Sequence, residues 1–254
     1  MINEDLFDLS GKTALVTGGR KGIGLGIASG LARQGADIIS VSSQQSETGD
    51  ELESIVKGFG RKFTGIKCDL TQRAELGALC NQISDSPIDI LVNNSGFSKR
   101  NKVLDHTYEN WDQTLEIDLT APFFLSQEIA KGMAKRGYGK IIFIASMWSF
   151  QGGLNVISYT AAKTGIVGLT RGMSNELIGS GINVNGIAPG FIATDITAPV
   201  RNDPKRMEQI SSRIPIGRWG NPDDLAGAAI FLAAKASDYV SGVVLPVDGG
   251  FLAN

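Results

Sequence analysis

The feature that most constrains this chain is a regular alternation of short, apolar, β-branched runs with segments long enough to form helices. Most of the runs are apolar throughout, which is typical of strands in a parallel sheet that helices cover on both faces. A run followed by a helical segment and another run indicates a βαβ unit. The predicted strands are 13–17, 37–41, 63–67, 88–92, 140–145, 182–187 and 242–247.

These units predict an α/β fold, a Rossmann-type doubly wound parallel sheet of about seven strands with helices on both faces. No Ser-, Gly- or Pro-rich linker divides the chain, so we expect a single domain over residues 1–254. The longest predicted helices cover 108–136 and 156–180. An irregular segment over 189–215 follows a strand and is a candidate lid, because ligands of such sheets bind beyond the carboxyl ends of the strands.

Charge and composition exclude several classes of partner. The 24 Lys and Arg residues face 26 Asp and Glu residues, which leaves a net charge of −2 and no basic surplus for nucleic acid or an anionic membrane. Hydrophobic residues make up 42% of the chain, enough for a large core. We therefore expect a globular protein that acts on a small-molecule substrate, with no nucleic-acid and no membrane partner.

The few cysteines and the single histidine argue against a metal site. Cys68 and Cys80 form no CxxC pair, and His106 has no second histidine with which to share a metal ion. The N-terminus is acidic and lacks an apolar leader segment. The sequence therefore predicts a cytoplasmic protein with no metal and no disulfide framework.

A glycine-rich turn follows the first predicted strand and precedes an apolar helix. Its pattern is GxxxGxG, which lets the backbone approach a pyrophosphate at the free N–H groups of a helix N-terminus. Such a turn is also compatible with a tight strand-to-helix connection that binds nothing, but its position between a strand and a helix favours a dinucleotide site. The predicted contacts in the turn are Gly18, Arg20, Lys21, Gly22, Ile23 and Gly24.

The end of the second predicted strand bears on the choice of cofactor. NAD sites usually place an acid there to hold the ribose 2′-OH, but this chain has Ser42 and Ser43. Lys21 could neutralise a 2′-phosphate instead, with the two hydroxyls as donors, unless it is only a solvated surface lysine. We expect NAD or NADP, with NADP slightly favoured.

Three further residues form a candidate catalytic group. Tyr159 and Lys163 are four residues apart in a predicted helix, which places them on one helical face. A phenol has a pKa of about 10, and a nearby ammonium lowers it by stabilising the phenolate. Ser146 ends the fifth strand, where its hydroxyl could donate to a substrate carbonyl. The alternative for the pair is a surface tyrosine beside a solvated lysine.

With these motifs in place, the chain resembles the short-chain dehydrogenase/reductase family from about Leu9 to its C-terminus. The resemblance rests on residues 17–24, Cys68-Asp69-Leu70, Asn93-Asn94-Ser95-Gly96, Ser146, Tyr159 with Lys163, Pro189-Gly190 with Thr194, and Val247-Asp248-Gly249-Gly250. It implies one dinucleotide-binding and catalytic domain that transfers a hydride between a nicotinamide and a secondary alcohol or ketone. It also implies a homotetramer formed through the two long helices and the C-terminal segment.

The resemblance also assigns roles in cofactor binding. It implies that Asp69, beside Leu70, holds the adenine amino group. It implies that Asn94 and Gly96 line the cofactor, and that Ile192 and Thr194, after Pro189-Gly190, contact the nicotinamide carboxamide. The family's tyrosine and lysine also contact the nicotinamide half, and these positions are Tyr159 and Lys163 here.

One position departs from the family pattern. The family usually has an asparagine where this chain has Asp118, and the asparagine carbonyl holds a water that bonds the lysine. A carboxylate could accept the same bond or pair directly with Lys163, but its negative charge would oppose formation of the Tyr159 phenolate. We therefore include Asp118 in the catalytic group and expect Asp118→Asn to keep or improve activity and to lower the pH optimum.

The substrate is predicted from weaker signals. Residues 145–153, 214–220 and 236–240 resemble the branch of the family that acts on keto-deoxy sugar acids. A sugar acid needs a cation for its carboxylate and polar groups for its hydroxyls. Lys99 with Arg100, and Gln151, could supply them beside Ser146 and Tyr159, although the two cations could also form a solvated loop pair.

Three alternative functions stay open at this point. A 3-oxoacyl-thioester reductase shares all the core motifs, and so does a gluconate 5-dehydrogenase or another polyol dehydrogenase. A dinucleotide-binding regulator without turnover is disfavoured by the intact Ser146, Tyr159 and Lys163, although Asp118 is compatible with it.

Overall fold

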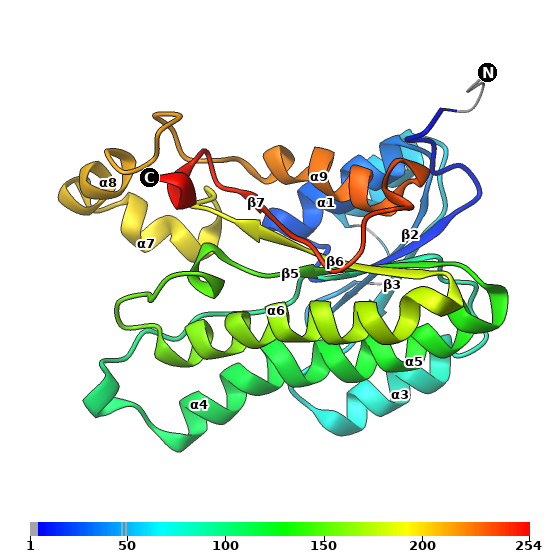
Figure 1. Cartoon of the computed structure of the whole chain (residues 1–254), viewed down its shortest axis with the longest axis horizontal. Coiled ribbons are helices and arrows are strands. Elements are labelled where there is room, and N and C mark those ends of the chain that lie inside the picture. Colours follow the sequence, from blue (N-terminus) through cyan, green and yellow to red (C-terminus); the bar gives the residue numbers. More distant parts are fainter. Residues whose placement is uncertain (1–4, 47, 49) are drawn as a thin grey trace.

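The structure is a computed structural model that describes residues 5–46, 48 and 50–254 (Figure 1). Its centre is a parallel sheet in the order β3-β2-β1-β4-β5-β6-β7, seven strands within the described residues. This architecture confirms the predicted α/β fold. The strands are β1 (Thr13–Thr17), β2 (Asp37–Ser42), β3 (Phe63–Lys67), β4 (Ile90–Asn93), β5 (Gly139–Ile144), β6 (Ile182–Pro189) and β7 (Val244–Val247).

Helices cover both faces of the sheet (Figure 1). The helices are α1 (Gly22–Arg33), α2 (Glu51–Gly58), α3 (Arg73–Ile83), α4 (Tyr108–Leu115), α5 (Ala121–Arg136), α6 (Ile157–Leu177), α7 (Ala198–Arg201), α8 (Pro204–Ser211) and α9 (Ala226–Ala233). Two separate apolar cores result. One packs the sheet against α3, α5 and α6 through Leu76, Leu125 and Ile166. The other packs it against α1, α2 and α9.

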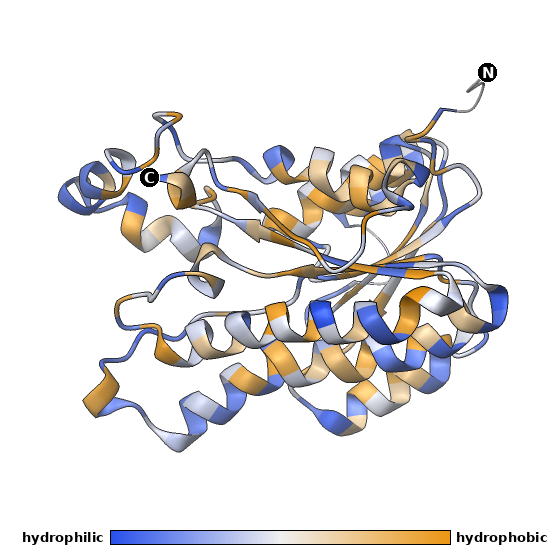
Figure 2. Ribbon diagram, viewed as in Figure 1, coloured by the Kyte–Doolittle hydropathy of each residue, from blue (hydrophilic) through white to orange (hydrophobic). Residues whose placement is uncertain are grey.

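The two cores explain why most of the predicted strands are apolar throughout. Successive side chains of a strand point to opposite faces, so Leu15 of β1 joins one core and Val16 joins the other. Figure 2 shows the same pattern, with apolar residues concentrated along the strands and polar residues on the outer sides of the helices. No helix in the described part of the chain is long and apolar enough to cross a bilayer.

The strand order reverses at β1, which pairs with β2 on one side and with β4 on the other. At such a switch point the connections leave β1 and β4 toward opposite faces, and a crevice opens beyond the carboxyl ends of the strands. The segment that holds α7 and α8 lies at the same end of the sheet (Figure 1). The order of the strands therefore fixes where a ligand can bind.

Two expectations about helices need correction. The continuous helix predicted over 108–136 is interrupted, because a π-helical turn at Glu116–Thr120 separates α4 from α5. The segment 189–215, predicted to be irregular, contains the short helices α7 and α8. The segment was predicted to be irregular because it is polar and contains prolines. Both helices have a proline in the first turn, a position that helices tolerate.

Candidate active site

A cleft of about 560 Å³ lies beyond the carboxyl ends of the central strands. Its lining combines residues from the glycine turn, from the ends of β2, β3 and β4, from α6 and from the segment after β6. The cleft thus brings together residues that are far apart in the sequence. The predicted site residues that line it are Gly18, Arg20, Lys21, Gly22, Ile23, Ser42, Ser43, Asp69, Leu70, Asn94, Gly96, Asp118, Tyr159, Lys163 and Thr194.

The glycine turn is held in place by close backbone contacts. A Cβ atom on Gly24 would lie 2.1 Å from the carbonyl oxygen of Gly18, so only glycine lets α1 start against this turn. The Asn94 amide donates to the carbonyl oxygen of Thr17 at 2.9 Å. The Thr17 hydroxyl in turn accepts from the backbone N–H groups of Asn94 and Ser95. Asn94 therefore fixes the turn to β4, in addition to lining the cleft.

The start of α1 is suited to an anion. No side chain caps it and its first turn holds no acidic residue, whereas α2 is capped by Asp50 and carries Glu51 and Glu53 in its first turn. The first N–H groups of a helix lack intrahelical partners, and the helix dipole favours negative charge there. The N-terminus of α1 thus keeps donors available for a pyrophosphate.

Cations and hydroxyls gather where the second strand ends. Lys21 lines the cleft, is mostly exposed, and lies 3.9 Å from the Asp195 carboxylate. Arg20 lies 3.6 Å from the buried carboxylate of Asp50. The Ser42 hydroxyl is buried and lacks a hydrogen-bond partner among the described residues. An unpartnered buried hydroxyl and an exposed lysine on the same cleft lining fit a phosphate ligand.

Asp69 lies on the cleft lining with its carboxylate held by the next residues. The backbone N–H and the hydroxyl of Thr71 both donate to Asp69 Oδ1, at 3.0 and 2.8 Å. This fixed carboxylate leaves Oδ2 able to accept a further bond, as an adenine amino group requires. The geometry is compatible with the role that the family resemblance implies for Asp69.

The catalytic candidates meet at the other end of the cleft. The first turns of α6 carry Tyr159 and Lys163, and the Lys163 Nζ atom lies 5.6 Å from the centre of the Tyr159 ring. The hydroxyls of Ser146 and Tyr159 are hydrogen-bonded to each other. Lys163 also donates to the carbonyl oxygen of Ile144 at 2.9 Å. The prediction that these side chains act together is thus supported by their contacts.

Ser149, which the sequence did not single out, fixes Ser146 to this helix. The Ser149 hydroxyl accepts from the backbone N–H of Ser146 at 3.2 Å and donates to the carbonyl oxygen of Lys163 at 2.7 Å. The end of β5 is therefore tied to α6 at the point where both present their reactive groups. No spacing motif marks Ser149, because its contacts are to backbone atoms.

Asp118 pairs with Lys163, one of the two arrangements that the sequence left open. Its Oδ1 atom lies 3.0 Å from Lys163 Nζ, and its side chain is fully buried. The π-helical turn that carries Asp118 is a local distortion that often occurs at functional sites. Gly96 lies against the pair, because a Cβ atom there would be 2.2 Å from Asp118 Oδ1.

Burial and mutual charge shift the pKa values of Tyr159, Lys163 and Asp118. Burial raises the pKa of Tyr159 above its usual value; the Lys163 charge opposes this, while the Asp118 charge adds to it. Burial raises the pKa of Asp118 against the effect of the Lys163 charge. Burial lowers the pKa of Lys163, but Asp118 and Tyr159 together outweigh it and the net shift is upward. Lys163 is therefore held as an ammonium.

Several predicted residues lie outside the lining of the cleft. Ser146 is buried and absent from the lining, but its hydroxyl is hydrogen-bonded to that of Tyr159, which lines the cleft. Ile192 is 4% exposed and packs against Gly220, and Gly190 packs against Asp248. The roles predicted for these residues stay predictions. The residues that do not line the cleft are Gly24, Arg100, Ser146, Gln151, Pro189, Gly190 and Ile192.

Sequence reasoning also missed part of the lining. Phe97 and Ser98 follow the Asn93–Gly96 motif, and Asp195 follows Thr194, so their nearness to the motifs was the available signal. The Ser98 hydroxyl is buried and unpartnered among the described residues. Lys99, predicted as a carboxylate partner, instead donates to the Gln113 side chain.

Comparison with known proteins places this geometry among nicotinamide-dependent enzymes. Residues 18–252 match the family described as enoyl-(acyl carrier protein) reductase. The chain is 50% identical to a 2-dehydro-3-deoxy-D-gluconate 5-dehydrogenase of Pseudoalteromonas atlantica, over 97% of this chain and 98% of that protein. It is also 50% identical to the protein of that name from Bacillus subtilis, over 98% of this chain and 97% of the relative.

A solved structure shares the fold over nearly the whole chain. It is a gluconate 5-dehydrogenase from Burkholderia cenocepacia in complex with NADP and tartrate. The two chains are 36% identical and superpose with a TM-score of 0.92, over 98% of each.

Proposed function

The chain belongs to the short-chain dehydrogenase/reductase family, and from that premise we propose that it is an NADP-dependent dehydrogenase of keto-deoxy sugar acids. The reaction would interconvert a secondary alcohol and a ketone, as in the 2-dehydro-3-deoxy-D-gluconate 5-dehydrogenases to which the chain is similar. The observation that carries the proposal is the Tyr159 phenol, placed between the Ser146 hydroxyl and the Lys163 ammonium at the end of a dinucleotide-sized cleft.

The proposed mechanism needs a proton donor and an oxyanion partner for the substrate carbonyl. In the direction of reduction, Tyr159 donates its phenolic proton to the carbonyl oxygen and Ser146 donates a hydrogen bond to the same oxygen. A nicotinamide held in the cleft by the glycine turn and Lys163 would supply the hydride that the carbonyl carbon accepts. In the direction of oxidation, the Tyr159 phenolate takes the proton of the alcohol. No step needs a metal ion, and the described residues hold no cluster of metal-ligating side chains.

Lys163 and Asp118 would set the proton affinity of Tyr159. The Lys163 ammonium lowers the pKa of the phenol, against the larger effect of burial. The Asp118 carboxylate keeps Lys163 protonated and raises the pKa of Tyr159. We infer that Asp118 is a positioning residue. It fixes Lys163 and keeps it protonated, and at the same time it makes the Tyr159 phenol less acidic.

The choice of NADP over NAD rests on Lys21 and Ser42. An exposed cation whose long ion pair with Asp195 is open to exchange, a buried unpartnered hydroxyl and the lack of an acid at the end of β2 all favour a 2′-phosphate. Lys21→Ala should therefore raise the KM for NADPH by about 10- to 100-fold and leave the KM for NADH unchanged, since one charged hydrogen bond is worth roughly 1.5–3 kcal/mol. Lys135→Ala, at an exposed site at the end of α5, is the matched control. Equal losses with both cofactors would overturn the assignment.

The substrate class is tested by a panel assayed through the absorbance of the reduced nicotinamide. Keto sugar acids, gluconate, neutral polyols and acetoacetyl thioesters should be compared with both cofactors. We expect the highest kcat/KM for a keto-deoxy sugar acid with NADPH. Preference for gluconate or a neutral polyol would favour a polyol dehydrogenase, preference for the thioester would favour a 3-oxoacyl reductase, and dinucleotide binding without turnover would favour a regulator.

We also propose that residues 1–254 act as one domain and assemble as a cytoplasmic homotetramer. The two apolar cores share one sheet, which supports a single folding unit. Cys68 and Cys80 are free thiols, as in reducing compartments. Phe124 on α5 and Ile157 on α6 are exposed apolar residues on the long helices. The mass of the protein measured by light scattering tests the assembly, and a monomer would contradict it.

A further inference from the structure

A bidentate ion pair joins α3 to the π-helical turn. Arg73 is the first residue of α3, and Glu116 is the first residue of the turn. The Nε and Nη2 atoms of Arg73 donate to the two carboxylate oxygens of Glu116, at 3.1 and 2.9 Å. Two parallel bonds of this kind fix the orientation of both side chains, which a single bond does not. The pair therefore helps to set where the turn lies relative to α3.

The ion pair connects two parts of the cleft wall. The segment just before Arg73 lines the cleft, and so does the segment just after Glu116. The lining residues of the two segments are Asp69, Leu70 and Thr71 in the first, and Ile117 and Asp118 in the second. The first segment contains the predicted adenine contact, and the second contains the partner of Lys163. The ion pair thus links the cofactor end of the wall to the catalytic end.

The α3 side of the ion pair is a well-paired support. The backbone N–H of Asp69 donates to the Glu75 carboxylate at 2.8 Å, and the Gln72 N–H donates to the Asp69 carbonyl oxygen at 2.9 Å. Thr71 donates twice to the Asp69 carboxylate. Arg73 therefore extends from a segment that is already fixed by its own hydrogen bonds.

The π-helical turn needs contacts on more than one side. Glu116 and Asp118 are two residues apart in a helical path, so they do not face the same way and their contacts do not replace each other. Asp118 lies 3.0 Å from Lys163 of α6. Leu119 also packs on α6, where a Cβ atom on Gly165 would be 2.9 Å from its side chain. The bond from Glu116 to α3 therefore holds the turn from a different side than α6 does.

We propose that Arg73 and Glu116 are positioning residues that hold the π-helical turn in place and thereby keep Asp118 on Lys163. This inference rests on the proposed function and adds two residues that touch neither substrate nor cofactor. Because the Arg73 side chain is 76% exposed, the ion pair should contribute little to the stability of the whole chain. Its effect should instead appear in the position of Asp118 and hence in catalysis.

The first test is the rate of Arg73→Ala. The kcat should fall by about two- to fivefold, the range expected for the loss of an exposed ion pair, while the melting temperature stays nearly unchanged. Arg73→Lys should recover only part of the loss, because an ammonium cannot bind bidentately. Lys57→Ala is the matched control, since Lys57 forms an exposed ion pair with Glu53 away from the cleft, and it should change neither quantity. An unchanged kcat in Arg73→Ala would overturn the proposal.

The pH profile separates the positioning of Asp118 from a general loss of activity. The charged groups that act on Tyr159 are Lys163 and Asp118, and the Asp118 charge raises the pKa of the phenol. In Arg73→Ala the carboxylate should be held less closely, so the profile of alcohol oxidation should move to lower pH, in the same direction as for Asp118→Asn and by less. A lower kcat with an unchanged profile would contradict a role through Asp118.

Hydrogen exchange tests the ion pair without turnover. The amides of residues 116–120 should exchange about two- to fivefold faster in Arg73→Ala and in Glu116→Ala than in the unmodified protein, and equally fast in Lys57→Ala. The double variant should exchange no faster than either single variant, because both substitutions remove the same contact. Faster exchange without turnover of any keto sugar acid would support the positioning role and overturn the proposed function. Unchanged exchange at residues 116–120 would overturn the positioning role.

Discussion

Two buried lysines at opposite ends of the sheet carry the same kind of ion pair. Lys140, near the start of β5, is 1% exposed and donates to Asp238 at 2.7 Å and to Asn183 at 3.0 Å. Lys163, beyond the carboxyl end of β5, is 4% exposed and lies 3.0 Å from Asp118. By burial and distance alone the two sites look equivalent.

The partners of the two lysines differ in their exposure. The Asp238 side chain is 61% exposed and its charge is solvated, whereas that of Asp118 is fully buried. Burial therefore lowers the pKa of Lys140 and Asp238 compensates only in part. Asp118 and Tyr159 instead outweigh burial at Lys163 and raise its pKa.

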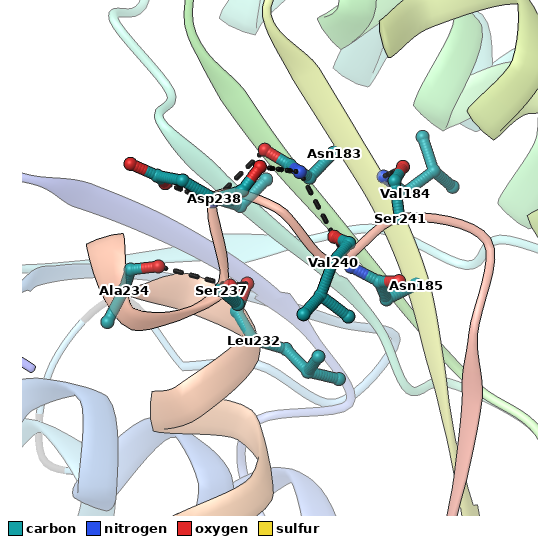
Figure 3. A network of polar contacts seen from close by, with 10 residues as sticks. Asn183, Val184, Asn185, Leu232, Ala234, Ser237, Asp238, Val240 and Ser241 are labelled. Atoms are coloured by element: carbon teal, nitrogen blue, oxygen red, sulfur yellow. Dashed lines mark hydrogen bonds and ion pairs between the residues drawn. The ribbon is translucent and has the colours of Figure 1, made fainter.

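The surroundings of the two ion pairs distinguish a structural role for Lys140–Asp238 from a role at the cleft for Lys163–Asp118. Asn183 and Asn185 of β6 donate to the backbone carbonyls of Asp238 and Val240, which ties the loop after α9 to the sheet (Figure 3). No residue of this network lines the cleft. A buried lysine therefore indicates chemistry only when its partner is also buried and the pair faces the ligand site.

The largest effect that would sharpen this contrast is expected from Tyr159→Phe. It removes the proton donor and one of the two oxyanion partners, so kcat should fall by about 10²-fold or more while the melting temperature and NADPH binding stay nearly unchanged. Tyr239→Phe, at a fully exposed tyrosine near Asp238, should have no effect on rate. Comparable kcat values for the two variants would remove Tyr159 from the reaction.

Gly96→Ala should disturb the catalytic pair from the side of the cleft. The new Cβ atom would lie 2.2 Å from Asp118 Oδ1 and 3.6 Å from Lys163 Nζ, so Asp118 must move. We expect a loss of about 1–3 kcal/mol in unfolding free energy together with a lower kcat. Gly77→Ala in α3 is the control, because its Cβ meets nothing within 4 Å, and it should be neutral or slightly stabilising. A normal rate for Gly96→Ala would show that the pair tolerates displacement.

Lys140→Met should affect stability alone. It leaves the side-chain amide oxygen of Asn183 without its donor, whereas the exposed Asp238 carboxylate can be solvated. The free energy of unfolding should therefore fall by about 1–3 kcal/mol. The kcat of the folded variant should equal that of the unmodified protein. Denaturant unfolding and steady-state kinetics measure the two quantities, with the exposed Lys135→Met as control. A large fall in the kcat of Lys140→Met would contradict the assignment of Lys140 to stability and of Lys163 to catalysis.

Asp118→Asn should change the pH dependence more than the maximum rate. The Asp118 charge raises the pKa of Tyr159, so its neutral replacement should lower that pKa and move the alcohol-oxidation profile to lower pH. We expect activity to be kept or improved. The profile of kcat/KM against pH measures the shift, and complete loss of turnover would show that the carboxylate is needed for more than charge.

The smallest expected effect is a pH slope in stability due to Lys140. Its pKa is lower in the folded protein than the ordinary value of 10.5, so the unfolded chain binds the proton more readily. Stability should therefore rise with pH in the alkaline window below 10.5, as this cost of burial disappears. Unfolding experiments across that window should show a shallower slope for Lys140→Met. Identical slopes would mean that Lys140 titrates normally in the folded state.

The sequence was sufficient for the parts of the site that follow a spacing rule. The glycine turn, the Tyr159–Lys163 pair and the strand that ends at Ser146 are local patterns, and their positions agree with the structure. Lys140 was not recognised as buried, because a lysine that opens an apolar run also fits a solvated strand end. The ion pair between Lys140 and Asp238 depends on packing between distant segments, which no local period encodes.

The π-helical turn at Glu116–Thr120 has a consequence for the length of this segment. Such a turn fits one more residue into a helical path than an α-helix does, so it sets the rotation of α5 relative to α4 about their common axis. Deleting a single residue there would allow one continuous α-helix from Tyr108 to Arg136. In that helix Asp118 would be rotated away from Lys163. Insertions and deletions in this stretch should therefore be tolerated worse than substitutions.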